Sequence, residues 1–449
     1  MNILRRLIPF FIVIALALTA YTAATAKPAH DPIALRNDIQ IRKVIDTGGG
    51  FVRMALDPLT HDLYYMDAKA NIYRLDIKPK TASKSTQIYR LADIGGAPYT
   101  TGLTFGANGT LYVVSNSSSG NTTQAIIRKG VLKASGLRTW STLASTVPYP
   151  RSGTQFDHVF SGIVVSPDGR YVYVNSGSRT DHGEVESSEG AFPDVREVAL
   201  TSAIFRIPTD VTNLVLPNNE AELKAKKYLF ADGTRNSYDL AFAPNGDLFA
   251  GDNGPDADYT EELNWLREGH HYGFPWRLGV DDNPQQFPNY NPSLDHRLPK
   301  DYFAIKKGLY HNDPTFPPPR MVFTDPIVNK GPDADEYREL DGSDSNQPIS
   351  TFTPHRTPLG LTFDTEGTLS KDFKGDAFIL SWGPEGGTLT DRGEDLLHLK
   401  LTKIGDTYQV YTTQLVRGFD RPIDNVLLNK NLYVLDYGGA GSIWKLTFP

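Results

Sequence analysis

Four pairs of polar residues stand directly before apolar strand patterns in widely separated parts of the chain. They are Asp157-His158, Arg235-Asn236, His355-Arg356 and Asp420-Arg421. A histidine can remove a proton, a carboxylate beside it can orient the ring, and arginines can stabilise the negative charge that develops in a reaction. If the strands begin at one place in the fold, we expect one catalytic funnel, with His158 as general base and Asp157 as the group that orients it.

Each of these residues also has a purely structural interpretation. His158 could be a hydrogen-bonded residue of the interior, and Arg235 and Arg421 could pair with carboxylates across neighbouring elements. The adjacent histidines His270 and His271 resemble a metal-binding pair, but neighbouring side chains of an extended segment point to opposite sides. We therefore expect a turn at that position.

The elements that must bring the polar pairs together are short β-strands. An apolar strand, a tight polar turn and a second strand rich in Tyr, Val and Leu recur six times, over residues 52–66, 102–114, 162–174, 239–250, 359–380 and 423–435. Asn-Gly and Asp-Gly pairs occupy several of the turns, because tight hairpins need backbone with positive φ. Third strands follow at 71–75, 203–207 and 442–446.

Six copies of such a unit predict an all-β fold, a six-bladed β-propeller of four-stranded blades, in which the first strand of each copy lines a central channel. A pair of β-sandwich domains is the alternative. The segment 277–350 is rich in Pro, Asn and Asp and has no apolar periodicity, so we expect a long loop insertion on one face of the propeller.

The first 26 residues have the pattern of a secretory signal peptide. Arg5 and Arg6 precede an apolar run at 7–18, and small residues end in Ala24-Thr25-Ala26. The run is shorter than the ~20 residues needed to span a bilayer, so we expect cleavage near Ala26 and export to the periplasm or the medium. Residues 27–449 then form a single propeller domain with no stable membrane insertion.

Composition excludes several classes of function. Among 449 residues there is no Cys, which excludes disulfides, thiolate metal sites and a Cys nucleophile. The net charge of -7 provides no basic surface for nucleic acid. The sequence has no P-loop, no Gly-x-Ser-x-Gly elbow and no His-Glu-x-x-His motif, so nucleotide cofactors and these hydrolase classes are not expected.

One stretch of about 40 residues resembles a known family. It contains 235–246, 252–256, Glu261-Glu262-Leu263-Asn264 and 269–276, in this order and spacing. The stretch is similar to the glucose/sorbosone dehydrogenase family of soluble pyrroloquinoline quinone (PQQ) enzymes. Weaker similarity extends from about Gly48 to Leu446.

The resemblance implies a six-bladed propeller that oxidises a sugar by hydride transfer to PQQ, with Ca²⁺ as Lewis acid. It implies His158 as the base, Arg235, Asn236, Arg421 and His355 at the cofactor, and the carbonyls of Gly254 and Pro255 as Ca²⁺ ligands. The implied partners are a small sugar and an external electron acceptor.

Two alternatives come from other classes. A Ca²⁺-dependent lactonase or esterase on a six-bladed propeller would need carboxylate and Asn ligands, such as Asn236 with Asp239 or Asp252. A non-catalytic propeller would bind carbohydrate or protein through its loops. The second alternative rests on two departures from the soluble glucose dehydrogenases: the strand 378–382 has no Lys, and the last blade offers one Arg where they use two.

Overall fold

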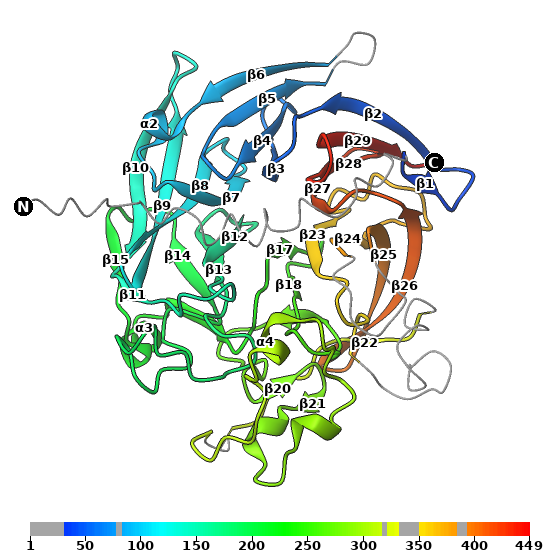
Figure 1. Ribbon diagram of the computed structural model, residues 1–449. Coiled ribbons are helices and arrows are strands. Elements are labelled where there is room, and N and C mark those ends of the chain that lie inside the picture. The colour runs from blue at the N-terminus through cyan, green and yellow to red at the C-terminus, as the bar shows by residue number, and fades with distance from the viewer. Residues whose placement is uncertain (1–30, 78–82, 317–320, 332–349, 384–392) are drawn as a thin grey trace, which may run out of the picture.

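The computed structural model describes residues 31–77, 83–316, 321–331, 350–383 and 393–449. Within these ranges the chain forms six small sheets arranged around one axis, and the first strand of each predicted hairpin lies innermost (Figure 1). The six inner strands contact one another in sequence order, and the last also contacts the first. The predicted six-bladed β-propeller is confirmed. The predicted signal peptide, residues 1–26, lies outside the described residues.

The six predicted hairpins are the two inner strands of the six blades. The first three blades contain β3 (Phe51–Leu56), β4 (Leu63–Asp67), β5 (Ile72–Asp76) and β6 (Lys84–Tyr89); β7 (Tyr99–Phe105), β8 (Leu111–Ser119), β9 (Thr122–Leu132), β10 (Arg138–Thr146), β11 (Tyr149–Pro150) and β15 (Leu214–Leu216); and β12 (Phe160–Val165), β13 (Tyr171–Ser176), β14 (Ala203–Pro208) and β16 (Leu229–Asp232). The last three contain β17 (Asp239–Phe242), β18 (Leu248–Asp252) and β19 (Glu262–Leu266); β23 (Pro358–Phe363), β24 (Ala377–Ser381), β25 (Asp395–Ile404), β26 (Thr407–Arg417), β1 (Ile33–Ala34) and β22 (Val328–Asn329); and β27 (Pro422–Leu428), β28 (Asn431–Asp436), β29 (Ser442–Thr447) and β2 (Gln40–Asp46). Short helices α2 (Leu91–Ile94) and α3 (Glu220–Ala225) lie in connections.

Turn chemistry explains why the hairpins form where the sequence predicts them. Gly109 and Gly169 follow Asn108 and Asp168 in the turns of the second and third blades, with φ of 77° and 72°. Glycine adopts these left-handed values without steric cost. The Asp168 carboxylate also accepts a hydrogen bond from the backbone N–H of Arg170 at 3.0 Å, which closes the second of these turns.

The fourth blade corrects the prediction of four strands per blade. Within the described residues it has three strands, and the insertion begins shortly after the third, β19. Where a fourth strand would pair, two returning segments make single contacts instead: Ile327 N donates to Leu263 O at 2.9 Å, and Glu261 exchanges two backbone hydrogen bonds with Phe352. The chain therefore leaves the blade to form the insertion and comes back only to cover its edge.

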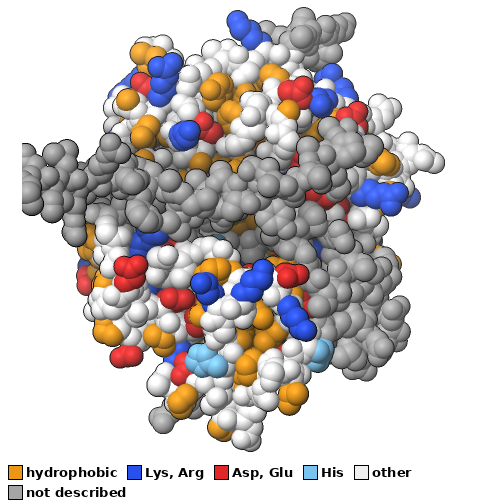
Figure 2. Space-filling model, viewed as in Figure 1, with side chains coloured by type: hydrophobic (Ala, Val, Ile, Leu, Met, Phe, Trp, Pro, Cys, Tyr) orange, Lys and Arg blue, Asp and Glu red, His pale blue; other side chains and the backbone are white. Residues whose placement is uncertain are grey.

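The insertion has more local structure than the predicted loop. It contains β20 (Arg277–Leu278), β21 (Asp281–Asp282), the 3₁₀ turns η1 (Pro284–Gln286) and η2 (Pro292–Leu294), and α4 (Phe303–Lys306). Buried residues Phe156, Tyr259, Phe274, Ala304 and Tyr310 form part of a small core beneath it. In Figure 2, apolar side chains lie beside basic and histidine side chains over this part of the molecule. The segments 317–320 and 332–349 lie outside the described residues.

The main core is divided among the junctions between blades. One cluster packs Tyr112 of β8 with Phe160 of β12 and Phe205 of β14, and further clusters fill the other junctions. The inner strands approach so closely that glycine is required: a Cβ on Gly162 of β12 would lie 2.4 Å from Tyr238 O, in the residue before β17. Among the described residues no helix is long and apolar enough to cross a membrane.

Candidate functional site

The predicted site residues stand where inner strands begin, and backbone hydrogen bonds hold three of them together. His158 precedes β12, and Arg235 and Asn236 precede β17. Ser178, which follows β13, joins them: His158 N donates to Ser178 O at 2.8 Å, and Ser178 N donates to Arg235 O at 2.7 Å. Two neighbouring blades thus bring the histidine and the arginine side by side.

Gly177 lets the two blades approach at this point. A Cβ there would lie 2.5 Å from His158 Cβ and 2.8 Å from Asn236 Oδ1. His158 and Asn236 therefore flank the same glycine, and any side chain at residue 177 would push them apart.

His158 is neutral in this environment. Burial and the positive charge of Arg235 lower the pKa of His158 to about 3. A histidine that stays unprotonated at neutral pH can accept a proton, as a general base must. The ring nitrogen Nδ1 lies 3.4 Å from Ser178 Oγ.

Asp157 does not orient His158, which corrects the prediction. Its two oxygens accept hydrogen bonds from the backbone of Ser152 at 2.6 Å and Gly153 at 2.8 Å, and Arg151 Nε lies 3.3 Å away. These contacts close the 151–157 loop. Adjacent residues of an extended segment point their side chains in different directions, so neighbourhood in sequence does not place a carboxylate on the ring.

Arg235 is buried and anchored by Asp181, a residue that the sequence did not indicate. Its Nε donates to Asp181 O at 2.7 Å, one terminal nitrogen lies 3.1 Å from Asp181 Oδ1, and the other donates to Asn253 O at 3.2 Å. Burial opposes ionisation of Asp181, but the hydrogen bond from His182 and the charge of Arg235 hold the pKa of Asp181 below its ordinary value. Three of the five guanidinium N–H groups are used in these contacts, which leaves two for a bound anion.

The predicted metal ligands lie directly after β18. The Asp252 carboxylate accepts hydrogen bonds from Arg235 N at 2.8 Å and Asn236 N at 2.5 Å, which fixes the start of the 252–256 turn beside the arginine. Gly254 N lies 3.4 Å from the carboxylate of Glu261. Within the described part of the chain, the carbonyls of Gly254 and Pro255 accept no hydrogen bond, and Asn253 Oδ1 is buried without a partner.

His355 and Arg421 lie farther around the ring. His355 is buried, its Nε2 lies 2.8 Å from Asp258 Oδ1, and its ring stacks on Tyr302. These contacts give it a packing role between loops, and its contact with a cofactor stays a prediction. The guanidinium of Arg421 lies 5.8 Å from the ring centre of Trp382, which itself packs against Tyr437. The sequence did not indicate these two aromatic residues.

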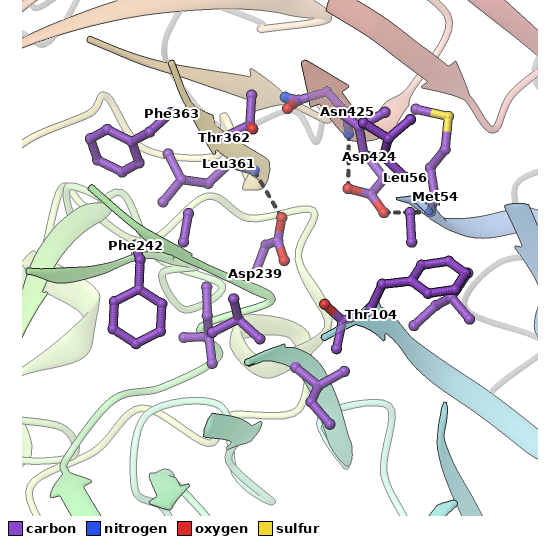
Figure 3. Close-up of a pocket in the computed structure, with 18 of the residues that line it drawn as sticks. Met54, Leu56, Thr104, Asp239, Phe242, Leu361, Thr362, Phe363, Asp424 and Asn425 are labelled. Atoms are coloured by element: carbon purple, nitrogen blue, oxygen red, sulfur yellow. Dashed lines mark hydrogen bonds between the residues drawn. The ribbon is translucent and has the colours of Figure 1, made fainter. Parts of the chain in front are cut away.

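A cavity lies elsewhere along the axis. About 310 Å³ in volume, it is lined by the later residues of the inner strands, such as Leu56, Phe105 and Phe363, whereas the predicted residues precede those strands. The carboxylates of Asp239 and Asp424 point into it (Figure 3). Among the described residues, no group of three or more His, Cys, Asp or Glu is arranged to hold a metal ion.

A family model described as Glucose / Sorbosone dehydrogenase matches residues 87–306. This range includes His158, Arg235, Asn236, Gly254 and Pro255. Over this stretch the chain is similar to the glucose/sorbosone dehydrogenase family, and the resemblance predicted from the sequence is confirmed.

A curated relative and several solved structures are also similar to this chain. Quinoprotein glucose dehydrogenase B of Acinetobacter calcoaceticus is 37% identical over 72 residues, which span 16% of this chain and 15% of that protein. The PQQ-bound aldose sugar dehydrogenase of Streptomyces coelicolor is 16% identical, with a TM-score of 0.53 over 93% of this chain and 100% of that chain. The holo PQQ domain of pyranose dehydrogenase from Coprinopsis cinerea is 13% identical, with a TM-score of 0.58 over 94% and 98%. At these identities the solved structures show the same fold.

Proposed function

We propose that this protein is a PQQ- and Ca²⁺-dependent dehydrogenase that oxidises an aldose or a sugar aldehyde and passes the electrons to an external acceptor. The observation that carries the proposal is the junction of His158, Arg235 and Asn236 around Ser178 and Gly177, inside the stretch that matches the family model. A neutral histidine and a buried arginine at one point suit an oxidation in which a hydroxyl loses its proton.

The donor groups of the site fit both implied ligands. The carbonyls of Gly254 and Pro255, which accept no hydrogen bond within the described residues, and the unpartnered Asn253 Oδ1 are oxygen donors of the kind that Ca²⁺ takes as ligands. Arg235 and Arg421 are cations suited to the carboxylates of PQQ, and Trp382 and Tyr437 beside Arg421 are flat surfaces suited to an aromatic ring. When bound, PQQ supplies a hydride acceptor and Ca²⁺ polarises its oxygen.

The remaining chemistry belongs to the side chains of this chain. His158 takes the proton of the sugar's anomeric hydroxyl as hydride leaves the same carbon. Arg235 holds negative charge beside the reacting groups, and Asp181 fixes the direction of its guanidinium. The buried turn 252–256 keeps the carbonyl ligands in place through Asp252.

The site is proposed to work outside the cytoplasm. Cleavage after Ala26 would leave a mature chain that begins at Lys27 and carries PQQ in the periplasm or the medium. The intact mass of the protein recovered from those fractions tests this point.

The placement of the acidic residues favours the dehydrogenase over the lactonase. A lactonase would need Asn236 with Asp239 or Asp252 as metal ligands. Both Asp252 oxygens are used on backbone N–H groups, and Asp239 lies in the axial cavity, where its carboxylate accepts from Leu361 N at 2.9 Å.

The test uses the purified mature chain, residues 27–449, with PQQ, Ca²⁺, a panel of aldoses and an artificial electron acceptor. We expect a change in the quinone absorbance on binding, and dye reduction that depends on the sugar. His158→Ala should lower kcat at least about 100-fold, the range that a general base contributes. The matched control is His61→Asn, because His61 lies in an exposed turn with φ of 60°, which asparagine tolerates.

Three results would contradict the proposal in different ways. No change in quinone absorbance at micromolar PQQ would leave a non-catalytic propeller. Lactone hydrolysis with Ca²⁺ alone would favour the lactonase. Equal activity of His158→Ala and His61→Asn would remove His158 from the mechanism.

A further inference from the structure

A neutral histidine carries one proton on either of its two ring nitrogens, and only the other nitrogen can act as a base. The proposed function therefore requires one particular tautomer of His158. The predicted orienting group, Asp157, is not on the ring. Another residue must set the tautomer.

Ser178 contacts the ring in a way that leaves one arrangement of protons. Its side chain is fully buried, and Oγ lies 2.8 Å from Thr180 O and 3.4 Å from His158 Nδ1. A carbonyl oxygen only accepts hydrogen bonds, and a serine hydroxyl has a single proton to donate. The proton of Ser178 is committed to Thr180, so Oγ can only accept from Nδ1–H.

The hydroxyl cannot easily turn to another partner, because the segment that carries it is held from both sides. The backbone of Ser178 bonds His158 and Arg235. Thr180 is fixed by Glu197, whose Oε1 accepts from Thr180 N at 3.1 Å and from Thr180 Oγ1 at 2.5 Å. Glu197 thus positions the carbonyl that takes the serine proton.

We propose that Ser178 is the positioning residue of the site: by accepting a hydrogen bond from Nδ1–H, it holds His158 in the tautomer whose Nε2 is the base. This inference rests on the proposed function only for its catalytic consequence. A serine is a neutral partner, so it fixes the tautomer without the negative charge with which a carboxylate stabilises a protonated imidazole. The base stays weakly basic and gives up its proton readily once the sugar is oxidised.

The tautomer can be measured without cofactor or activity. Protein labelled with ¹⁵N-histidine is studied by NMR at pH 7.5, and the His158 signals are assigned by comparison with His158→Gln. We expect a protonated Nδ1 and an unprotonated Nε2. A protonated Nε2 in the wild-type protein would overturn the proposal whatever the activity of the enzyme.

Variants then separate positioning from simple packing. In Ser178→Ala the signals should shift toward a mixture of tautomers. With PQQ and sugar, kcat should fall about 10- to 100-fold, the loss that is typical when the hydrogen-bond partner that orients a metal-bound histidine is removed. Ser178→Thr keeps the hydroxyl and should restore the wild-type tautomer. Ser176→Ala is the matched control, because buried Ser176 also donates to a carbonyl, Leu200 O at 2.6 Å.

The failure of this proposal differs from failure of the proposed function. If the wild-type tautomer is as expected but no sugar is oxidised, Ser178 still positions His158 and the dehydrogenase proposal falls. If Ser178→Ala and Ser176→Ala give the same spectra and rates, the serine is only a packing residue.

Discussion

The charge state of each residue at the site follows from what surrounds it. His182 lies 2.8 Å from Asp181, and although burial opposes its protonation, Glu184 and Asp181 raise its pKa above the ordinary value. His158 lies beside Arg235, and its pKa is lowered. The pKa values of these two buried histidines are therefore shifted in opposite directions, that of His182 upward and that of His158 downward.

This difference predicts how acid affects stability. The pKa of His158 is about 3 in the folded chain and about 6.5 when unfolded, so between these values the unfolded chain binds the extra proton. The contribution of His158 to stability is complete above about pH 6.5 and is lost as pH falls toward 3. Between pH 7.5 and 5, His158→Gln should lose about 1–2 kcal/mol less unfolding free energy than the wild type.

Urea denaturation of the cofactor-free protein at the two pH values measures this difference. His61→Asn serves as the control, and it should follow the wild type. An identical pH dependence in His158→Gln and the wild type would show that His158 titrates normally.

At the residue level, the structure brings together those predicted residues whose position is set by the strand that follows them. His158, Arg235 and Asn236 were indicated because each precedes an inner strand, and inner strands converge. Ser178 was beyond such reasoning, because its contact with His158 joins residues 20 apart through the geometry of two blades. The predicted orienting role of Asp157 was wrong because residues that are adjacent in sequence do not have to have side chains in contact.

At the scale of elements, turns and close approaches decide the geometry. The hairpins could be predicted because Asn-Gly and Asp-Gly turns and alternating apolar residues are local signals. The three strands described in the fourth blade could not be predicted from local signals. Whether a fourth strand pairs there depends on where the insertion returns, which is beside Leu263 and Phe352. The small core under the insertion could not be predicted either, because its aromatic residues have no periodicity in the sequence and come into contact only in the folded chain.

The variant Gly177→Ala tests whether the close approach of the third and fourth blades positions the residues of the site. The Cβ of Gly177→Ala would meet His158 Cβ at 2.5 Å and Asn236 Oδ1 at 2.8 Å, so the third and fourth blades must shift apart. Overpacking of this kind costs about 1–3 kcal/mol, and we expect kcat to fall with it because His158 and Arg235 separate. Thermal unfolding and dye reduction measure the two effects.

Gly106→Ala is the comparison for Gly177→Ala. Its new Cβ would meet first the side-chain oxygen of Asn108 at 3.2 Å, which can move aside. This variant should keep wild-type activity and stability within about 1 kcal/mol. If Gly177→Ala behaves the same way, the blades are not in tight contact at the site.

At the scale of the whole molecule, strand pairing in the last blade closes the ring of blades, and charged side chains connect blades near the axis. β2, from the N-terminal part of the chain, pairs with the last strand β29, so the last blade combines strands from both parts of the described chain, while β1 pairs with β26 of the fifth blade. Near the axis, Arg53 of the first blade donates from Nε to Thr101 O of the second blade at 2.7 Å, and also bonds Tyr238 O before the fourth. Its guanidinium lies 3.5 Å from Asp239.

The carboxylates of Asp239 and Asp424 lie near Arg53, and burial raises the pKa of both. Burial, together with the nearby Asp239, raises the pKa of Asp424 to about 8, so Asp424 is mostly neutral at pH 7. Burial also raises the pKa of Asp239, but Arg53 opposes the effect. Arg53 and Asp239 thus lie within ion-pair distance at the axis, beside an Asp424 that is mostly neutral at pH 7.

Removing one partner of a buried ion pair leaves the other charge uncompensated, which costs about 3–5 kcal/mol. Arg53→Met should therefore lower the unfolding free energy by that amount, whereas Arg53→Met with Asp239→Asn should lose at least about 1 kcal/mol less than the sum of the single variants. Urea denaturation at pH 7.5 gives all four values of the cycle. Arg74→Met is the control, since Arg74 belongs to the same blade, is 47% exposed and lies 3.8 Å from Asp62; it should change stability by less than about 1 kcal/mol. Strictly additive effects of the two axial substitutions would mean that the blades are held by packing alone and that the charges at the axis act independently.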